Sequence, residues 1–281
     1  MFKKVSIIIP CYNQEKFISE AIESALNQTY KNIEIVVIND ASKDNSSEVI
    51  QKYANMHTNI IFIDEKENKG VVKSRNLAIS KACGDYILPL DGDDKIEPTF
   101  VEKAVNILDS DEEIRIVYSR TKFFGYLNKE FRLETFNPNK IIFNNCIPNT
   151  AMYRKSDFVA VCGYQDYMQD GWEDWDLWLS ILENAPNKEK CAHRINEILF
   201  FYRIQNVKTR NSFSPEITNK LLLNLIFNHK SLCLYNSCFF KYINKYSPHK
   251  LNKKNKMIKK LVFIIVVEFF VILALCLANF L

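Results

Sequence analysis

Three carboxylates fall within four positions of the chain, at Asp91, Asp93 and Asp94, directly after a short apolar run. Crowding these charges together costs electrostatic energy. A divalent cation would remove that cost, because Mg²⁺ and Mn²⁺ take oxygen ligands and keep further sites for water and substrate phosphates. The alternative is an acidic turn in which Gly92 supplies an unusual backbone angle. The cluster alone leaves both interpretations open.

A second concentration of acids, Glu173 and Asp174, begins a segment in which Trp175, Leu179 and Leu182 recur at helical spacing. The two carboxylates therefore lie in the first turn of a predicted helix. The helix macrodipole favours acids there, which is a purely structural explanation. A catalytic role is the alternative, and this segment does not decide between them.

The elements that must position these acids alternate between strand and helix. Continuous apolar runs, typical of strands buried on both faces of a parallel sheet, occur at residues 5–10, 33–38, 60–63 and 86–90. The spacing of apolar residues predicts helices at 15–26, 46–55, 70–82 and 98–108. This alternation is typical of a doubly wound α/β sheet flanked by helices, in which ligands bind beyond the carboxyl ends of the strands. Tyr12, Asp40 and Asp91 each follow a strand end, so we predict that they share one crevice.

The alternation becomes irregular beyond Thr121. Further strands are predicted at residues 114–118, 149–154 and 198–202, and a short helix at 155–161. We expect this second half of the chain to cover the crevice and to select what else enters it. An amphipathic helical region follows from Pro215 to about Lys245.

The composition favours a cytosolic protein with a basic tail. The formal net charge of the 281 residues is +4, but from residue 217 onward there are ten lysines and one acid, Glu268. Eight cysteines are scattered without a Cys-x-x-Cys pair, which indicates reduced thiols. The four histidines also lack the spacing of zinc ligands, so no zinc site is expected.

Residues 261–281 are predominantly apolar. As a helix rising about 1.5 Å per residue they would match a hydrocarbon core of about 30 Å. Insertion free energies favour a transmembrane helix despite Glu268, and the lysines at 250–260 place the preceding flank in the cytosol. We therefore expect a C-terminal anchor at the cytoplasmic face of the cell membrane, with no nucleic acid bound to the basic tail. A buried helix in a soluble bundle is the alternative.

An ordered series of motifs between about residues 4 and 205 resembles glycosyltransferase family 2. The motifs are Val5–Asn13, Ala21–Tyr30, Val36–Asp44, Asn68–Gly70, Arg75–Asn76, Asp91–Asp94 and Glu173–Asp174. Several motifs in the right order are far more specific than any one of them, so the resemblance favours metal binding and catalysis for the two acidic groups. It implies a GT-A fold, a doubly wound mixed sheet flanked by helices, in which a nucleotide-binding α/β domain is fused to an acceptor-binding half. It also implies a nucleotide-diphospho-sugar donor and a divalent cation, Mn²⁺ or Mg²⁺.

The resemblance assigns the nucleotide base to residues at the ends of the first two strands. Tyr12 and the backbone near Pro10 are expected to flank the base, together with Asn13. Asp40 is expected to accept a hydrogen bond from it.

The same resemblance gives roles to residues near the ribose and the diphosphate. Asp91, with Gly92 beside it, is expected near the ribose and the metal-bound waters, and is counted among the metal-binding residues. Asp93 is the expected direct metal ligand. Arg75 and Asn76 are expected to order the nucleotide pocket.

The catalytic roles follow from the reaction that the family implies. The acceptor hydroxyl must lose a proton as it attacks, and a nearby carboxylate can act as general base. Asp174 is the predicted base, with Glu173 holding the geometry or an acceptor hydroxyl, and Asp94 is expected to orient the neighbouring acids. Direct in-line displacement would invert the anomeric centre.

Three features depart from the family pattern. The usual acidic pair at the end of the second strand is Asn39-Asp40 here, which keeps one of the two carboxylates. Gln205 stands where a histidine often follows the Tyr-Arg pair, so no extra metal or phosphate contact is expected from it. The Gln-x-x-Arg-Trp motif of processive synthases is absent from the sequence, which favours addition of one sugar at a time.

We therefore predict an inverting, metal-dependent hexosyl- or N-acetylhexosaminyl-transferase. It would use a UDP-sugar and act on a glycan or lipid-linked acceptor in surface polysaccharide biosynthesis. The predicted domains are a glycosyltransferase domain at 1–212 (halves 1–120 and 121–212), a basic helical linker at 213–260 and the anchor at 261–281. The rival is a catalytically inactive nucleotide-sugar-binding or scaffold protein of the same fold. A nucleotidyltransferase is disfavoured, because the sequence has no glycine-rich phosphate loop near its N-terminus.

Overall fold

The computed structural model describes residues 3–205 and 213–235 of the chain. Residues 1–229 form one compact unit, and residues 230–281 form a second, of which the short helix α8 (Lys230–Tyr235) is described. All residues predicted to bind or to catalyse lie in the first unit.

Four parallel strands form the half of the sheet that comes first in the chain. They are β1 (Val5–Cys11), β2 (Ile33–Asp40), β3 (Ile60–Glu65) and β4 (Tyr86–Pro89), in the spatial order β3-β2-β1-β4. The helices between them are α1 (Ile18–Leu26), α2 (Ser46–Met56) and α3 (Val71–Lys81). The predicted alternation of strand and helix is confirmed, with the ends of the elements displaced by a few residues.

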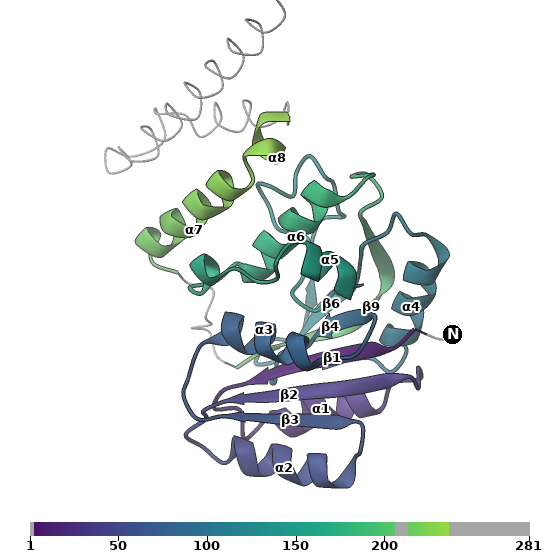
Figure 1. Cartoon of the computed structure of the whole chain (residues 1–281), viewed down its shortest axis with the longest axis vertical. Coiled ribbons are helices and arrows are strands. Elements are labelled where there is room, and N and C mark those ends of the chain that lie inside the picture. Colours follow the sequence, from purple (N-terminus) through teal and green to yellow (C-terminus); the bar gives the residue numbers. More distant parts are fainter. Residues whose placement is uncertain (1–2, 206–212, 236–281) are drawn as a thin grey trace, which may run out of the picture. The chain divides into compact units, whose positions relative to one another are not determined.

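Helices cover both faces of these strands, which explains why the strand sequences are continuously apolar. Successive residues of a strand point to opposite faces. Ile7 and Ile9 of β1 belong to the core cluster that includes α1 and α4 (Phe100–Ser110). Ile8 is equally buried and points to the opposite face, which α3 covers (Figure 1). A strand buried on two sides is therefore apolar at most positions, and the buried exceptions Ser6 and Glu34 bond to each other at 2.6 Å.

The second half of the first unit continues the same sheet. Its strands are β5 (Lys95–Ile96), β6 (Ile116–Gly125), β7 (Glu130–Phe131), β8 (Met152–Arg154) and β9 (Ala192–Ile204). β8 pairs antiparallel with β4 and with β6, whereas β9 runs parallel to β6. Within the described residues the nine strands thus form one mixed sheet, as predicted. The helical segments of this half are α5 (Lys155–Ala160), η1 (Asp166–Met168) and α6 (Glu173–Asn184).

The helix α7 (Pro215–Asn228) follows in the first unit, beyond the domain end expected at residue 212. Ser214 caps it, because its hydroxyl accepts the N–H of Ile217 at 3.3 Å.

The 14 residues of α7 span about 21 Å, which is shorter than a hydrocarbon core of about 30 Å. In residues 3–205 and 213–235, no helix is both long and apolar enough to cross a membrane. The predicted span at 261–281 lies outside the described residues. We therefore correct the predicted localisation, since this structure gives a C-terminal anchor at the membrane no support.

Candidate active site

The acidic loop after β4 is fixed against the end of β1. A Cβ atom at Gly92 would lie only 3.1 Å from the carbonyl oxygen of Pro10, so glycine permits this close approach. The N–H of Asp94 donates to the carbonyl oxygen of Asp91 at 3.0 Å and closes the turn. Asp94 is 2% exposed, and its carboxylate accepts the N–H of Arg203 at 2.7 Å. The third acid of the cluster therefore ties the loop to β9.

Gln205 holds the carboxylate of Asp93 in place. Its Nε2 donates to Oδ2 of Asp93 at 2.7 Å, and Nε of Arg203 donates to the carbonyl oxygen of Asp93 at 2.7 Å. Burial, and then the negative charge of Asp91, raise the pKa of Asp93. From the sequence no metal or phosphate contact was expected of Gln205, because it stands where the family often has a histidine. The structure brings it directly behind the predicted metal ligand.

Arg75 connects the acidic loop to the second group of acids. Its side chain is 2% exposed. Nη2 donates to Oδ1 of Asp91 and Nη1 donates to Oε1 of Glu173, each at 2.6 Å. The guanidinium also lies 5.6 Å from the ring centre of Tyr164. One buried cation on α3 thus joins carboxylates that are distant in the sequence, in addition to any role in ordering a nucleotide.

Asp174 lies beside Glu173 in the first turn of α6. Its Oδ1 accepts the N–H of Trp175 at 2.8 Å, and its Oδ2 accepts Nδ2 of Asn145 at 3.4 Å. Burial, and then the negative charge of Glu173, raise the pKa of Asp174 to about 7. A carboxyl group with a pKa near neutrality is suited to proton transfer at neutral pH.

Two asparagines that the sequence did not single out contact the predicted site residues. Besides the bond from Asn145 to Asp174, Nδ2 of Asn149 donates to Oδ1 of Asp91 at 3.3 Å. Both asparagines belong to the irregular stretch before β8. That stretch shows no periodicity, so their side chains gave no signal beyond their being polar.

The residues directly after β1 are the ones expected to flank the nucleotide base. Tyr12 is 42% exposed, and an exposed ring can stack on a nucleotide base. Asn13 adopts a left-handed backbone conformation with φ of 54°, and its Oδ1 accepts the N–H of Lys43 at 2.8 Å. Asn13 therefore joins the two loops that border this site.

Two of the predicted nucleotide-binding residues make structural contacts within the protein. The carboxylate of Asp40 accepts the N–H groups of Lys69 and Gly70 at 2.8 and 2.9 Å, and so holds the loop before α3. The amide of Asn76 pairs with the backbone of Tyr164, donating to its carbonyl oxygen at 2.7 Å and accepting its N–H at 3.0 Å. Direct contact of Asp40 or Asn76 with a nucleotide stays a prediction.

Asp91 and Asp93 fit a divalent cation. Arg75 and Asn149 bond to Oδ1 of Asp91, and Gln205 bonds to Oδ2 of Asp93. The other oxygen of each carboxylate makes no hydrogen bond to another residue in the described part of the chain. Mg²⁺ is commonly held by one or two carboxylates together with waters and substrate phosphates. Since the described residues contain no group of three metal-ligating side chains, water and donor would have to complete the coordination.

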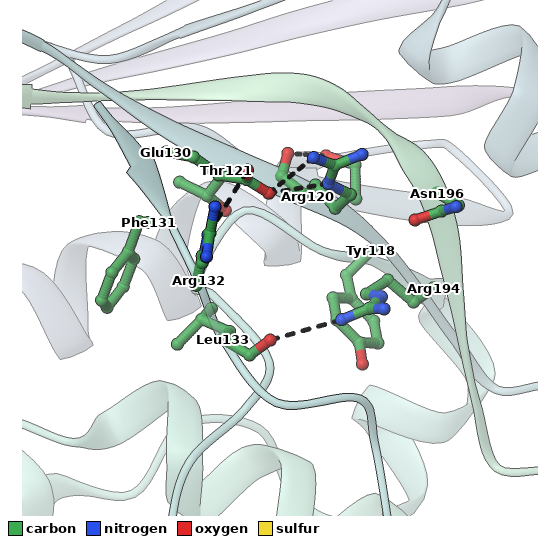
Figure 2. Close-up of a pocket in the computed structure, with 10 residues that line it drawn as sticks. Tyr118, Arg120, Thr121, Glu130, Phe131, Arg132, Leu133, Arg194 and Asn196 are labelled. Carbon is green, nitrogen blue, oxygen red and sulfur yellow. Dashed lines mark hydrogen bonds and ion pairs between the residues drawn. The ribbon is translucent and has the colours of Figure 1, made fainter. Parts of the chain in front are cut away.

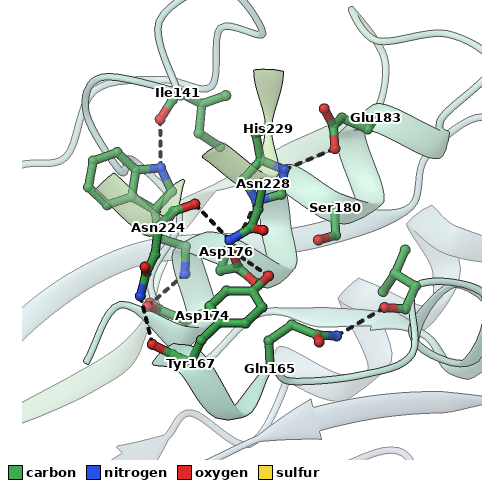
Figure 3. A network of polar contacts seen from close by, with 12 residues as sticks. Ile141, Gln165, Tyr167, Asp174, Asp176, Ser180, Glu183, Asn224, Asn228 and His229 are labelled. Atoms are coloured by element: carbon green, nitrogen blue, oxygen red, sulfur yellow. Dashed lines mark hydrogen bonds and ion pairs between the residues drawn. The ribbon is translucent and has the colours of Figure 1, made fainter. Parts of the chain in front are cut away.

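His229, which directly follows α7, contacts two acids of α6 (Figure 3). Its Nε2 lies 3.0 Å from Oδ1 of Asp176, and its Nδ1 lies 2.9 Å from Oε2 of Glu183. The hydroxyl of Tyr167 donates to Oδ2 of Asp176 at 3.3 Å. Burial lowers the pKa of His229, but the hydrogen bonds to the two carboxylates outweigh it and raise the pKa to about 9. A carboxylate at each ring nitrogen thus matches a charged imidazolium that fastens α7 to the helix of Asp174.

Comparison with known proteins relates this geometry to a family of enzymes. The family model described as glycosyl transferase family 2 matches residues 6–168. A putative glycosyltransferase of Bacillus subtilis, EpsE, is 31% identical over 229 residues, covering 78% of this chain and 80% of the relative. Chondroitin synthase of Escherichia coli is 28% identical over 198 residues, covering 68% of this chain and 29% of the relative.

Solved structures share the fold. The crystal structure of Staphylococcus aureus TarS 1–349 in complex with UDP-GlcNAc superposes with a TM-score of 0.68 at 20% identity, covering 87% of this chain and 73% of that one. At this identity the likeness concerns the fold alone, and it agrees with the mixed sheet described above. The family match extends over more than half of the chain, and one relative of similar length reaches 31% identity. This chain therefore belongs to glycosyltransferase family 2.

Proposed function

We propose that the chain transfers a sugar from a UDP-sugar to a hydroxyl of a glycan or lipid-linked acceptor, with inversion of the anomeric centre. The observation that carries this proposal is the pair of 2.6 Å contacts from the buried Arg75 to Asp91 and to Glu173. The loop predicted to hold the donor diphosphate is thereby joined to the helix turn that carries Asp174. A donor bound at the loop would present its sugar close to a carboxylate that can accept a proton.

Asp91 and Asp93 would hold Mg²⁺ or Mn²⁺, which when bound neutralises the charge that develops on the leaving diphosphate. The protein fixes these carboxylates in advance. Gln205 holds Asp93, and Arg75 with Asn149 holds Asp91. Such second contacts would orient the two carboxylates as metal ligands.

Asp174 is the proposed general base. As the acceptor oxygen forms its bond to the anomeric carbon, its proton passes to the Asp174 carboxylate and the bond to the diphosphate breaks. Attack from the side opposite the leaving group inverts the anomeric centre. Glu173, paired with Arg75, would hold the geometry of this turn. The raised pKa of Asp174 supports the assignment, because a stronger base accepts the proton more readily.

The substrate classes are supported by the relatives. The fold is shared with a protein solved with UDP-GlcNAc, which favours a UDP-sugar donor, either hexosyl or N-acetylhexosaminyl. A synthase of a polysaccharide is among the relatives, which favours a saccharide acceptor and a role in polysaccharide biosynthesis.

A panel of nucleotide-sugars tests the proposal. With Mn²⁺ present, a bound donor stabilises only the folded protein and raises its melting temperature. We expect a UDP-sugar to give the largest shift, and chelation of the metal to abolish it. The absence of a shift with every donor would contradict the proposal.

Donor hydrolysis separates the enzyme from its inactive rival. The wild-type protein should release UDP slowly from the donor in the presence of Mn²⁺. A protein that binds the donor but neither hydrolyses it nor transfers its sugar would be the nucleotide-sugar-binding or scaffold protein instead.

A further inference from the structure

A cavity of about 210 Å³ lies where β6, β7 and β9 meet (Figure 2). The pairing of β6 with β9 is regular except around Arg120, where the register shifts twice. Such irregularities leave residues unpaired and bend the strand locally. The principal lining residues are Tyr118, Arg120, Thr121, Glu130, Arg132 and Arg194. None of them belongs to the proposed catalytic site.

The cavity carries an excess of positive charge. Arg120 donates to Oε1 of Glu130 through Nε at 2.8 Å and Nη2 at 2.7 Å. Nε of Arg132 lies 3.9 Å from the other oxygen of the same carboxylate. Arg194 donates only to a neutral group, the carbonyl oxygen of Leu133 at 3.3 Å, and forms no ion pair with a described acid. The lining therefore holds three guanidinium groups against one carboxylate, and only Arg120 and Arg132 contact that carboxylate.

A simple structural role explains only part of this arrangement. One arginine is enough to fasten β7 to β6 through Glu130, and Arg120 does so. Figure 2 shows Arg132 and Arg194 on opposite sides of the cavity, where they add charge without such a function.

The size of the cavity selects a small ligand. At about 30 Å³ per water it corresponds to roughly seven waters, and it lies below the range of about 300–1,000 Å³ typical of sites for drug-sized molecules. It can therefore take one anionic group or one charged sugar unit. Guanidinium groups bind the oxygens of phosphates and carboxylates in pairs of parallel hydrogen bonds, which suits such a ligand.

The cavity is connected to the catalytic site by the same two strands that form it. Phe124 of β6 pairs with Arg203 of β9, whose side chain binds the backbone of Asp93. Arg120 lies four residues before Phe124, which corresponds to about 13 Å along the strand. The cavity is thus too far from Asp93 to hold the donor diphosphate, but within the length of a few sugar units of a bound acceptor.

We propose that this cavity binds an oxyanion of the acceptor glycan, a phosphate or a sugar carboxylate that lies some sugar units away from the reacting hydroxyl. The proposal rests on the proposed function for the identity of the ligand as an acceptor. The binding of an oxyanion in the cavity can be tested without any transfer.

The first test uses selenate as a probe in crystals of the full chain. We expect anomalous density between Arg132 and Arg194 in the wild-type protein and in Lys129→Gln, a control that removes an exposed charge next to the cavity. The double variant Arg132→Gln/Arg194→Gln should lose this density. Equal UDP binding in all variants would show that the donor site is intact. Absence of selenate from the wild-type cavity, or its persistence in the double variant, would overturn the proposal.

The folding of the variants needs its own control. Arg132 is the safest single substitution, because its side chain is 88% exposed. If the double variant does not fold, Arg132→Gln alone should still weaken selenate binding, and unchanged binding would count against the proposal.

The second test compares acceptors that share the same terminal sugar. One carries a uronate, one carries a phosphodiester and one is neutral. For the anionic acceptor that the cavity recognises, Arg132→Gln/Arg194→Gln should raise KM by at least about tenfold, the effect of losing one charge-assisted hydrogen bond. The value of kcat, the KM of the donor and the KM of the neutral acceptor should stay unchanged. Equal effects on all three acceptors would overturn the proposal.

Failure of the wild-type protein to bind any donor would instead contradict the proposed function, and the selenate result would still decide whether the cavity is an anion site.

Discussion

Nε2 of Gln205 donates to Oδ2 of Asp93 across 2.7 Å and so joins the end of β9 to the loop after β4. The contact fixes one oxygen of the carboxylate that we assign to the metal. The effect of this contact on metal affinity can be measured separately from turnover, because binding of Mn²⁺ is observed directly.

Replacing Gln205 by alanine should weaken binding of the metal. Loss of a second contact to a metal ligand typically lowers metal affinity by about 10- to 100-fold. Electron paramagnetic resonance of free Mn²⁺, in the presence of UDP, measures this directly. Gln51→Ala, which removes an exposed amide on α2, is the control and should bind Mn²⁺ as the wild type does. Equal Mn²⁺ affinity in Gln205→Ala and the control would exclude a role for this contact.

Replacing Arg75 by methionine should destabilise the fold. It leaves Asp91 and Glu173 without their counter-charge, and removal of one partner of a buried ion pair costs about 3–5 kcal/mol. Asp91 is 33% exposed, so water compensates in part and we expect the lower end of this range. Urea denaturation measures the change in the free energy of unfolding.

The pair formed by Lys103 and Glu197 is a matched control for Arg75, because its 2.6 Å separation is the same but both side chains are more exposed. Lys103→Met should cost no more than about 1 kcal/mol. Arg75→Lys should fall between the two, because one ammonium group cannot replace a guanidinium that bonds two carboxylates at once. Equal costs for Arg75→Met and Lys103→Met would contradict the bridging role.

The transfer rate should depend on the protonation of Asp174. Its pKa is raised to about 7, and a general base must be unprotonated to work. The value of kcat/KM for the acceptor should therefore rise about tenfold per pH unit below neutrality and level off above it. Asp174→Asn should lower the rate by roughly 10²- to 10⁴-fold and flatten the profile, while donor affinity stays nearly intact. If the variant kept the wild-type rise with pH, another group would be the base.

The attachment of α7 to α6 should make stability depend on pH at alkaline values. The pKa of His229 is raised from 6.5 to about 9, so the imidazolium stabilises the folded state fully below pH 6.5. This contribution is lost as the pH rises through 9, and it amounts to about 3 kcal/mol. Urea unfolding near pH 6 and near pH 10 would measure it. His229→Leu should remove most of this difference in the free energy of unfolding. His57→Gln, at the end of α2, should leave the difference unchanged. The same pH difference in wild type and His229→Leu would assign it to other groups.

The sequence allowed the positions of the strand-end residues to be predicted, because these depend on local order. Asp40 and Asp91 each follow an apolar run, and parallel strands bring their carboxyl ends to one edge of the sheet. The contacts of Asn145, Asn149 and Gln205 could not be predicted in this way. They depend on how segments far apart in the chain approach one another, and an amide in an irregular segment has no periodicity to reveal it.

The shortest elements were missed for a related reason. β5 and β7 have two residues each, too few to show the alternation that identifies a strand. The cavity beside β7 was missed with them. The ion pair from Arg75 to Glu173 was also unexpected, although the resemblance had identified both residues. A sequence motif identifies functional residues but does not show which of their side chains are in contact.

The bridge through Arg75 has a consequence for recombination within the family. Its arginine comes from the half predicted to bind the donor (1–120), and one of its acids comes from the half predicted to bind the acceptor (121–212). A chimera that grafts a foreign acceptor-binding half after residue 120 would inherit one end of the bridge from each parent. Only parents that preserve an acid at the position of Glu173 would leave the buried guanidinium neutralised on both sides. The two halves are therefore interchangeable modules only among members that share this pairing, which gives a simple rule for choosing parents when acceptor specificity is to be exchanged.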